Sequence, residues 1–180
     1  MTVAAVLLLG VVAAAGSGLA LRPERVRSSA GAVLLVVLLG TAAVLAWQAG
    51  EPADPLGTAG VVAAVLAAAC AGGPVTTAVL RAADPAGAGV GGGPADPQVL
   101  RGGAWIGVLE RLAVAATLLG GFGEGLAVVL AVKGLGRYAE LKAPAAAERF
   151  IIGTLASALW AAACVGVAQL LRASGPPLSQ

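Results

Sequence analysis

The stretch GAWIGVLERLAVAATLLG, residues 103–120, places two adjacent charges, Glu110 and Arg111, inside an otherwise apolar segment. The segment is about long enough for a helix that crosses a membrane, where a charged side chain costs roughly 3 kcal/mol on insertion scales. Such charges are retained mainly where they face other protein, water or a ligand. We therefore expect Glu110 and Arg111 to mark the polar centre of a membrane protein.

Helical spacing divides this stretch into two faces. The face that carries Glu110 consists mainly of small residues, which let helices approach closely in lipid; its other positions are Gly103, Gly107, Val114, Thr117 and Gly121. The opposite face is bulkier and suits acyl chains; it holds Trp105, Leu109, Leu112, Ala116 and Leu119. Glu110 is therefore expected to face protein, with Arg111 about 100° further round the helix.

The composition of the whole chain supports a membrane location. Of its 180 residues 59% are hydrophobic and 11% are charged, and the mean hydropathy is +0.94, which excludes an ordinary soluble domain. Apolar runs long enough to cross a bilayer recur along the chain, at about 3–21, 30–49, 57–80, 103–120, 124–140 and 149–171. This pattern predicts an all-α, polytopic helical membrane protein with about six transmembrane helices.

The positive charges indicate how these spans are oriented. If the N-terminus is outside and the six spans alternate, the inner side receives most of the basic residues, namely Arg22, Arg25, Arg27, Arg81, Arg101, Arg137, Lys142 and Arg149. The outer side receives Arg172, together with Glu51, Asp54 and Glu124. Basic residues accumulate on the cytoplasmic side of membrane proteins. We expect an N-out, C-out protein of the bacterial inner membrane.

The absence of histidine from the sequence closes off imidazole metal sites and His-based acid–base catalysis. The sequence has two cysteines, Cys70 and Cys164, and both lie within predicted spans. We interpret them as small buried hydrophobic residues. We expect no metal and no cofactor.

The chain divides into two three-span halves. Residues 1–81 form the N-terminal half, 82–102 a flexible cytoplasmic linker rich in glycine and proline, 103–172 the C-terminal half with the charged motifs, and 173–180 a short tail. The glycine run of the linker lacks the Gly-Lys-Ser/Thr ending of a phosphate-binding loop. Within the third span Pro74 follows two glycines, which predicts a kink or a broken last turn.

The short turn at residues 120–124 sets the register between the fourth and fifth spans. An antiparallel hairpin folded about this turn places Lys133 at the depth of Glu110, so the two can form an ion pair. Lys133, Arg137 and Glu140 follow one another at i+4 and i+3 and share a helix face. Arg111 and Arg137 would then remain as a positive excess beside the pair.

The sixth span is expected to begin at Pro144 and to bring further polar groups to the same place. Glu148 stands in its first turns, and Thr154 and Ser157 offer hydroxyl groups. The candidate polar cluster therefore comprises Glu110, Arg111, Lys133, Arg137, Glu140, Glu148, Thr154 and Ser157.

Three functions are compatible with such a cluster. We expect first that it serves a small binding or transport component, in which a charged site within the membrane, near the cytoplasmic face, takes an anionic small molecule, an ion or a proton. It can belong to a structural or partner subunit, in which the charges only hold helices together and the partner is another membrane protein or a second copy. It can also form part of an enzyme acting on lipid-phosphate head groups. No nucleophile motif stands out, however, and a protein that is not an enzyme is the better interpretation. The lipid bilayer is the expected environment in each case, and nucleic acid is not an expected partner.

Three motifs carry a resemblance to a known family. They are Ile106-Gly107-x-Leu109-Glu110-Arg111, then Lys133-x-x-x-Arg137, then Glu148-x-Phe150-x-Ile152-Gly153-Thr154-Leu155-x-Ser157. This section resembles the C-terminal membrane part of an uncharacterised bacterial multi-span family, a domain of unknown function. The chain departs from the family pattern at Arg149, where the family has tyrosine, and at Gly134, where it has serine. The resemblance covers about 55 residues, excludes the first hundred, and implies a family without implying an activity.

Overall fold

The computed structural model describes residues 1–21, 29–49, 54–83 and 103–173, and over these ranges the chain is entirely helical. The helices are α1 (Thr2–Ala20), α3 (Ser29–Trp47), α4 (Asp54–Ala83), α5 (Gly103–Leu119), α6 (Glu124–Gly136) and α7 (Pro144–Ala173), with a 3₁₀ turn η2 at Glu140–Lys142. Within the described ranges, four helices are long and apolar enough to cross a membrane, namely α1, α3, α4 and α7. The all-helical prediction is confirmed.

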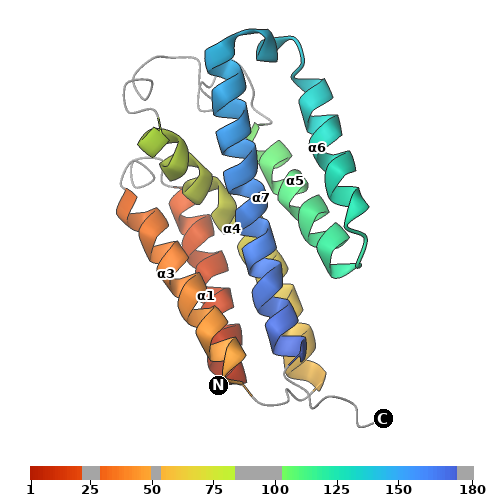
Figure 1. Cartoon of the computed structure of the whole chain (residues 1–180). Coiled ribbons are helices and arrows are strands. Elements are labelled where there is room, and N and C mark those ends of the chain that lie inside the picture. The colour runs from red at the N-terminus through yellow and green to blue at the C-terminus, as the bar shows by residue number, and fades with distance from the viewer. Residues whose placement is uncertain (22–28, 50–53, 84–102, 174–180) are drawn as a thin grey trace.

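The helices α4 and α7 form the centre of the molecule, because each has 30 residues and each contacts the other along its length. On one side α1 packs against α4 and α3 packs against both α1 and α7. On the other side the hairpin of α5 and α6 is attached through α5, which contacts α4 and α7 (Figure 1). The two halves of the sequence are therefore joined by direct helix contacts.

The core is built from small side chains. Ala64, Ala67, Ala68 and Ala71 of α4 are fully or almost fully buried, so the neighbouring helices approach this backbone closely. Gly16 of α1 lies so near that a Cβ atom on it would stand 2.8 Å from the backbone nitrogen of Ala71. Such packing is how helices associate where lipid removes the hydrophobic drive between them.

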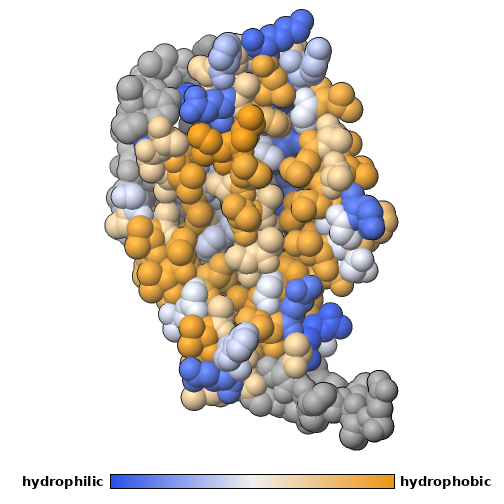
Figure 2. Space-filling model, in the orientation of Figure 1, coloured by the Kyte–Doolittle hydropathy of each residue, from blue (hydrophilic) through white to orange (hydrophobic). Residues whose placement is uncertain are grey.

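The outer surface is strongly apolar. Figure 2 shows hydrophobic residues over most of the middle of the visible face, and hydrophilic residues toward its upper and lower ends and at one place on its right edge. Large exposed side chains such as Leu7, Val37, Leu109 and Leu159 contribute to this surface, each with more than half of its area exposed. A contiguous apolar surface of this kind is rare on soluble monomers.

Two predictions about individual helices need correction. The helix α4 has no broken turn at Pro74 but continues to Ala83; within the turn that follows Gly73, the hydroxyl of Thr77 donates to the carbonyl oxygen of Gly73 at 3.0 Å. The helix α6 ends at Gly136 rather than near residue 140, because the amide of Arg137 turns back to the carbonyl oxygen of Gly134. The predicted start of the last helix at Pro144 is confirmed.

Several predicted features fall outside the described residues. These are most of the linker (84–102), the tail beyond Ala173, and the charges Arg22, Arg25, Arg27, Glu51 and Arg101.

Candidate functional site

The α5–α6 hairpin depends on how α5 ends. Gly121 has φ +70°, the left-handed conformation that favours glycine. Its amide donates to the carbonyl oxygen of Leu118 at 3.4 Å, and the amide of Phe122 donates to that of Thr117 at 2.9 Å. This is the hydrogen-bond pattern of a Schellman cap. The cap reverses the chain within a few residues and fixes the register of α6 against α5.

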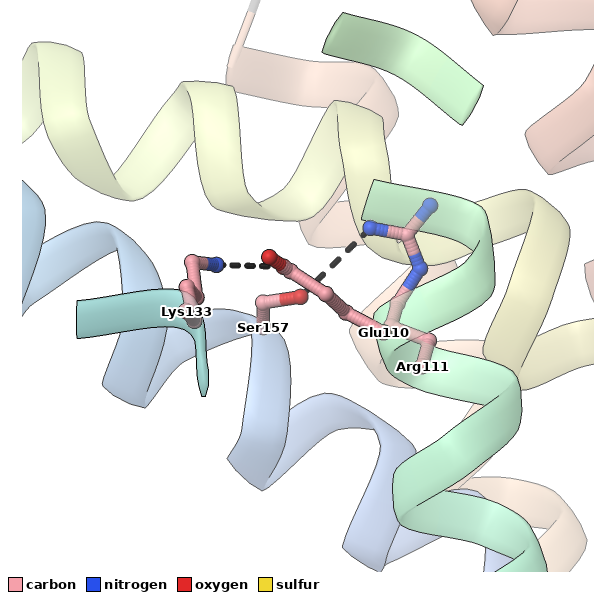
Figure 3. A network of polar contacts seen from close by, with 4 residues as sticks. All are labelled: Glu110, Arg111, Lys133 and Ser157. Atoms are coloured by element: carbon pink, nitrogen blue, oxygen red, sulfur yellow. Dashed lines mark hydrogen bonds and ion pairs between the residues drawn. The ribbon is translucent and has the colours of Figure 1, made fainter. Parts of the chain in front are cut away.

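That register brings Glu110 of α5 to Lys133 of α6, as the sequence predicts. The Lys133 Nζ atom forms an ion pair with Oε2 of Glu110 (Figure 3). The two side chains are only 19% and 18% exposed. Lys133 also stands 5.9 Å from the centroid of the Phe150 ring on α7, within the range of a cation–π contact. The ammonium group therefore links all three C-terminal helices.

Arg111 points in a different direction from its neighbour Glu110. Its Nε and Nη2 atoms both donate to the carbonyl oxygen of Ala69 on α4, at 3.1 and 2.8 Å. Its Nη1 atom donates to the hydroxyl of Ser157 on α7 at 3.4 Å (Figure 3). The side chain is 5% exposed. A planar guanidinium suits this task, because its donors are fixed in a fork that can reach two helices at once.

This geometry adds to one prediction. Arg111 keeps its positive charge beside the ion pair, but its donors are directed at neutral protein acceptors on α4 and α7. The reason is the helical step of about 100° between consecutive residues. Glu110 faces the hairpin partner, and Arg111 faces the central helices.

A glycine on α4 makes room for the guanidinium. A Cβ atom at Gly72 would lie 2.7 Å from Nε of Arg111 and 3.0 Å from Cδ1 of Trp160. Trp160 in turn donates from its indole nitrogen to the carbonyl oxygen of Ala67 at 3.2 Å. Two long side chains from α5 and α7 thus donate to the same stretch of α4 backbone.

Sequence reasoning missed Gly72, Trp160 and the acceptors on α4. The carbonyl oxygens of Ala67 and Ala69 leave no trace in a sequence, since every residue has one. The pair Gly72-Gly73 beside Pro74 was visible, but we interpreted it as a helix interruption. A glycine inside a helix is also a position of close approach, and that alternative identifies Gly72.

A small cavity lies between the ion pair and α7. Its volume is about 10 Å³, room for roughly one water molecule. It is lined by Glu110, Arg111, Val114, Val129, Leu130, Lys133, Thr154, Ser157 and Ala158. The Thr154 hydroxyl is buried and has no hydrogen-bond partner within the described part of the chain.

The remaining predicted residues lie further out. Arg137 follows the end of α6 and is half-buried, and Glu148 is exposed in the first turns of α7. The side chain of Glu140 lies outside the described residues. The structure therefore concentrates the predicted cluster on Glu110, Arg111, Lys133, Thr154 and Ser157. Among the described residues there is no group of three or more Cys, Asp or Glu side chains placed to hold a metal ion.

Comparisons of the chain with protein-family models, with curated proteins and with solved structures found no match.

Proposed function

We propose that this chain is a structural or partner subunit of a membrane, in which a charged cluster locks the α5–α6 hairpin onto the central helices α4 and α7. The single observation that carries the proposal is the arrangement of Arg111. It is almost fully buried, and three of its nitrogen atoms donate to acceptors on two other helices. The donors of this buried charge point to other helices and not to an open site. The charge therefore serves to fix the positions of those helices.

A lysine in place of Arg111 tests this lock. Arg111→Lys keeps the positive charge but loses the planar fork, so one ammonium must replace contacts to both α4 and α7. We expect the free energy of unfolding in detergent or bicelles to fall by about 2 kcal/mol, given interhelical polar contacts of roughly 0.6–1.7 kcal/mol each. The matched control is Arg172→Lys, at an exposed arginine near the end of α7. Equal stability of the two variants would contradict the lock.

A second function is favoured by a separate observation. The unpartnered Thr154 hydroxyl lines a small cavity together with the Glu110–Lys133 pair. The helix α6 that closes this cavity is mostly exposed, with Gly125 as its buried residue. A binding or transport component would move α6 outward and admit an ion or a small anion. The present cavity holds about one water, so this function requires that motion.

Ligand-dependent stability separates the two functions. A species that binds the folded state raises the free energy of unfolding by RT ln(1 + [L]/Kd), and the unfolding temperature rises with it. Binding at the cavity predicts such a rise with sodium chloride or inorganic phosphate, lost in Thr154→Val and kept in Thr77→Val, whose hydroxyl bonds within α4. No rise with either salt, or an equal rise in both variants, would count against a binding site.

The proposed environment is the bacterial inner membrane, with both termini outside. The inner ends of the helices carry Arg81, Lys142 and Arg149, while the outer ends carry Asp54 and Arg172. This sidedness is the same whether the α5–α6 hairpin crosses fully, which gives the six spans expected from sequence, or only part-way. The resemblance of the three C-terminal motifs to a bacterial multi-span family agrees with this location.

Cysteine labelling tests the orientation. In a chain without Cys70 and Cys164, a cysteine at Asp54 should react with a membrane-impermeant maleimide added outside intact cells, and one at Asp96 should react only after the cells are opened. Reaction of both from the same side would refute the orientation.

A further inference from the structure

The charges of the polar cluster do not balance. Glu110 pairs with Lys133, whereas Arg111 is 5% exposed and donates to neutral acceptors on α4 and α7. Figure 3 shows the two cationic groups on either side of the Glu110 carboxylate and the Ser157 hydroxyl. The cluster therefore has one positive charge in excess. A buried charge without a counter-charge is costly in a medium of low dielectric constant, so this excess favours an anion.

The same side chains also have more hydrogen-bond donors than acceptors. A guanidinium offers five N–H groups and an ammonium three. Three N–H groups of Arg111 donate to α4 and α7, and one of Lys133 donates to Glu110. The remaining N–H groups make no further hydrogen bond within the described part of the chain, and the buried hydroxyl of Thr154 makes none there. A species that accepts hydrogen bonds satisfies all of these groups.

The spare donors belong to residues that line one cavity. Arg111, Lys133 and Thr154 all contribute to the cavity between the ion pair and α7. Glu110 is the acidic residue among the described residues that line it, and its charge is already paired with Lys133. A cation in the cavity would therefore meet an excess of positive charge, whereas an anion would meet attraction.

The size of the cavity limits the anion. Its volume is about 10 Å³, which is room for roughly one water molecule. A halide ion is a single atom and needs only a small adjustment of the walls. Phosphate and carboxylates have several heavy atoms and need a larger one. The rest of the wall is mostly apolar, formed by Val114, Val129, Leu130 and Ala158.

We propose that this cavity binds a monovalent anion of halide size, held by Arg111, Lys133 and the hydroxyl of Thr154. The inference rests on the second function proposed above, in which the cavity is a binding site, and it names the class of ligand. The bound ion neutralises the excess charge of the cluster. Three N–H groups of Arg111 stay on α4 and α7, so binding leaves the contacts of the hairpin with the central helices in place.

Thermal unfolding of the full chain in detergent, at constant ionic strength, tests the class of ligand. Sodium fluoride, chloride and bromide are compared with sodium gluconate and sodium phosphate, and chloride is then supplied with sodium, potassium or choline. We expect a saturable rise of the unfolding temperature with at least one halide. The rise should not depend on the cation, and it should exceed the rise with phosphate.

Three variants locate the effect, each compared with its own baseline in gluconate. Thr154→Val should weaken the apparent halide affinity about tenfold, because a hydrogen bond to the ion is lost. Thr76→Val is the matched control, since the Thr76 hydroxyl is likewise buried without a partner in the described residues but does not line the cavity. Glu110→Gln should strengthen halide binding, because it removes the negative charge beside the ion. If Glu110→Gln does not fold, the comparison of the two threonine variants decides.

The outcomes separate this inference from the binding function on which it rests. A rise that follows the cation, or one that occurs with phosphate but with no halide, would overturn the halide site and leave a binding site of another kind. An equal halide effect in Thr154→Val and Thr76→Val would place the ion elsewhere and overturn the inference. The absence of a specific rise with every salt would contradict both the inference and the binding function.

Discussion

At the scale of single residues, two neighbouring glycines of α4 distinguish the effect of contact with Arg111 from other effects of replacing a glycine within a helix. A Cβ atom at Gly72 would collide with the Arg111 side chain, whereas one at Gly73 meets nothing within 4 Å. Gly72→Ala should lower the free energy of unfolding by about 1–3 kcal/mol, because Arg111 must leave its acceptors. Gly73→Ala should change it less than Gly72→Ala does, because its added Cβ atom crowds only the ring of the next residue, Pro74. Equal effects of the two changes in chemical unfolding would show that Arg111 does not need the space at Gly72.

The Glu110–Lys133 pair is a second residue-scale test. Removing either partner leaves the other charge uncompensated in a mostly buried position, so Glu110→Gln and Lys133→Met should each be destabilising. The double variant should recover part of that loss, with a coupling free energy of about 1 kcal/mol. Strictly additive losses in the double-mutant cycle would mean that each charge has its main partner elsewhere.

How much of this cluster was predictable depends on the kind of partner. The Glu110–Lys133 pair followed from the sequence, because a short turn between two helices fixes which residues share a depth. The contact between Arg111 and the Ala69 carbonyl did not follow, since a backbone acceptor has no residue signature. Ser157 was recognised as an available hydroxyl, but its role as an acceptor for Arg111 became clear only from the packing of α5 against α7.

At the scale of elements, the cap between α5 and α6 is the feature that sets the hairpin register. Gly121→Ala places a side chain in the left-handed region, which costs about 1–2 kcal/mol. Gly123→Ala is the matched control, since Gly123 has φ −60° and an open Cβ position. We expect thermal unfolding to show a loss for Gly121→Ala and little change for Gly123→Ala. If Gly123→Ala lowers the unfolding temperature as much as Gly121→Ala does, the left-handed conformation of Gly121 is not the cause of the loss.

The helices themselves were predictable to different degrees. The apolar runs located α1, α3, α4 and α7 well, because length and hydrophobicity suffice for such helices. The extent of α6 was overestimated, because Arg137 and Glu140 continue the helical spacing that begins at Lys133, whereas the backbone tightens after Gly134. Of the two effects expected at Pro74, a kink or a broken turn, the broken turn is not found, because α4 packs against neighbouring helices and stays continuous through the proline.

At the scale of the whole molecule, the structure consists of a four-helix body and an attached hairpin. The body is held by close contacts among small residues along α1, α3, α4 and α7. The hairpin reaches that body through α5, whose buried residues Arg111, Val114 and Ala115 are the inward-facing ones. In this arrangement the polar contacts of Arg111 with α4 and α7 fix where the hairpin sits on the body.

The most direct measurement of this central claim is the distance between the hairpin and the body. Spin labels at Val128→Cys on α6 and Val36→Cys on α3, both exposed positions, report that distance by pulsed dipolar spectroscopy in a chain without Cys70 and Cys164. We predict a single narrow distance distribution for the chain with Arg111 and a broader or displaced one for Arg111→Lys. An unchanged narrow distribution in folded Arg111→Lys protein would contradict the claim that Arg111 locks the hairpin in place.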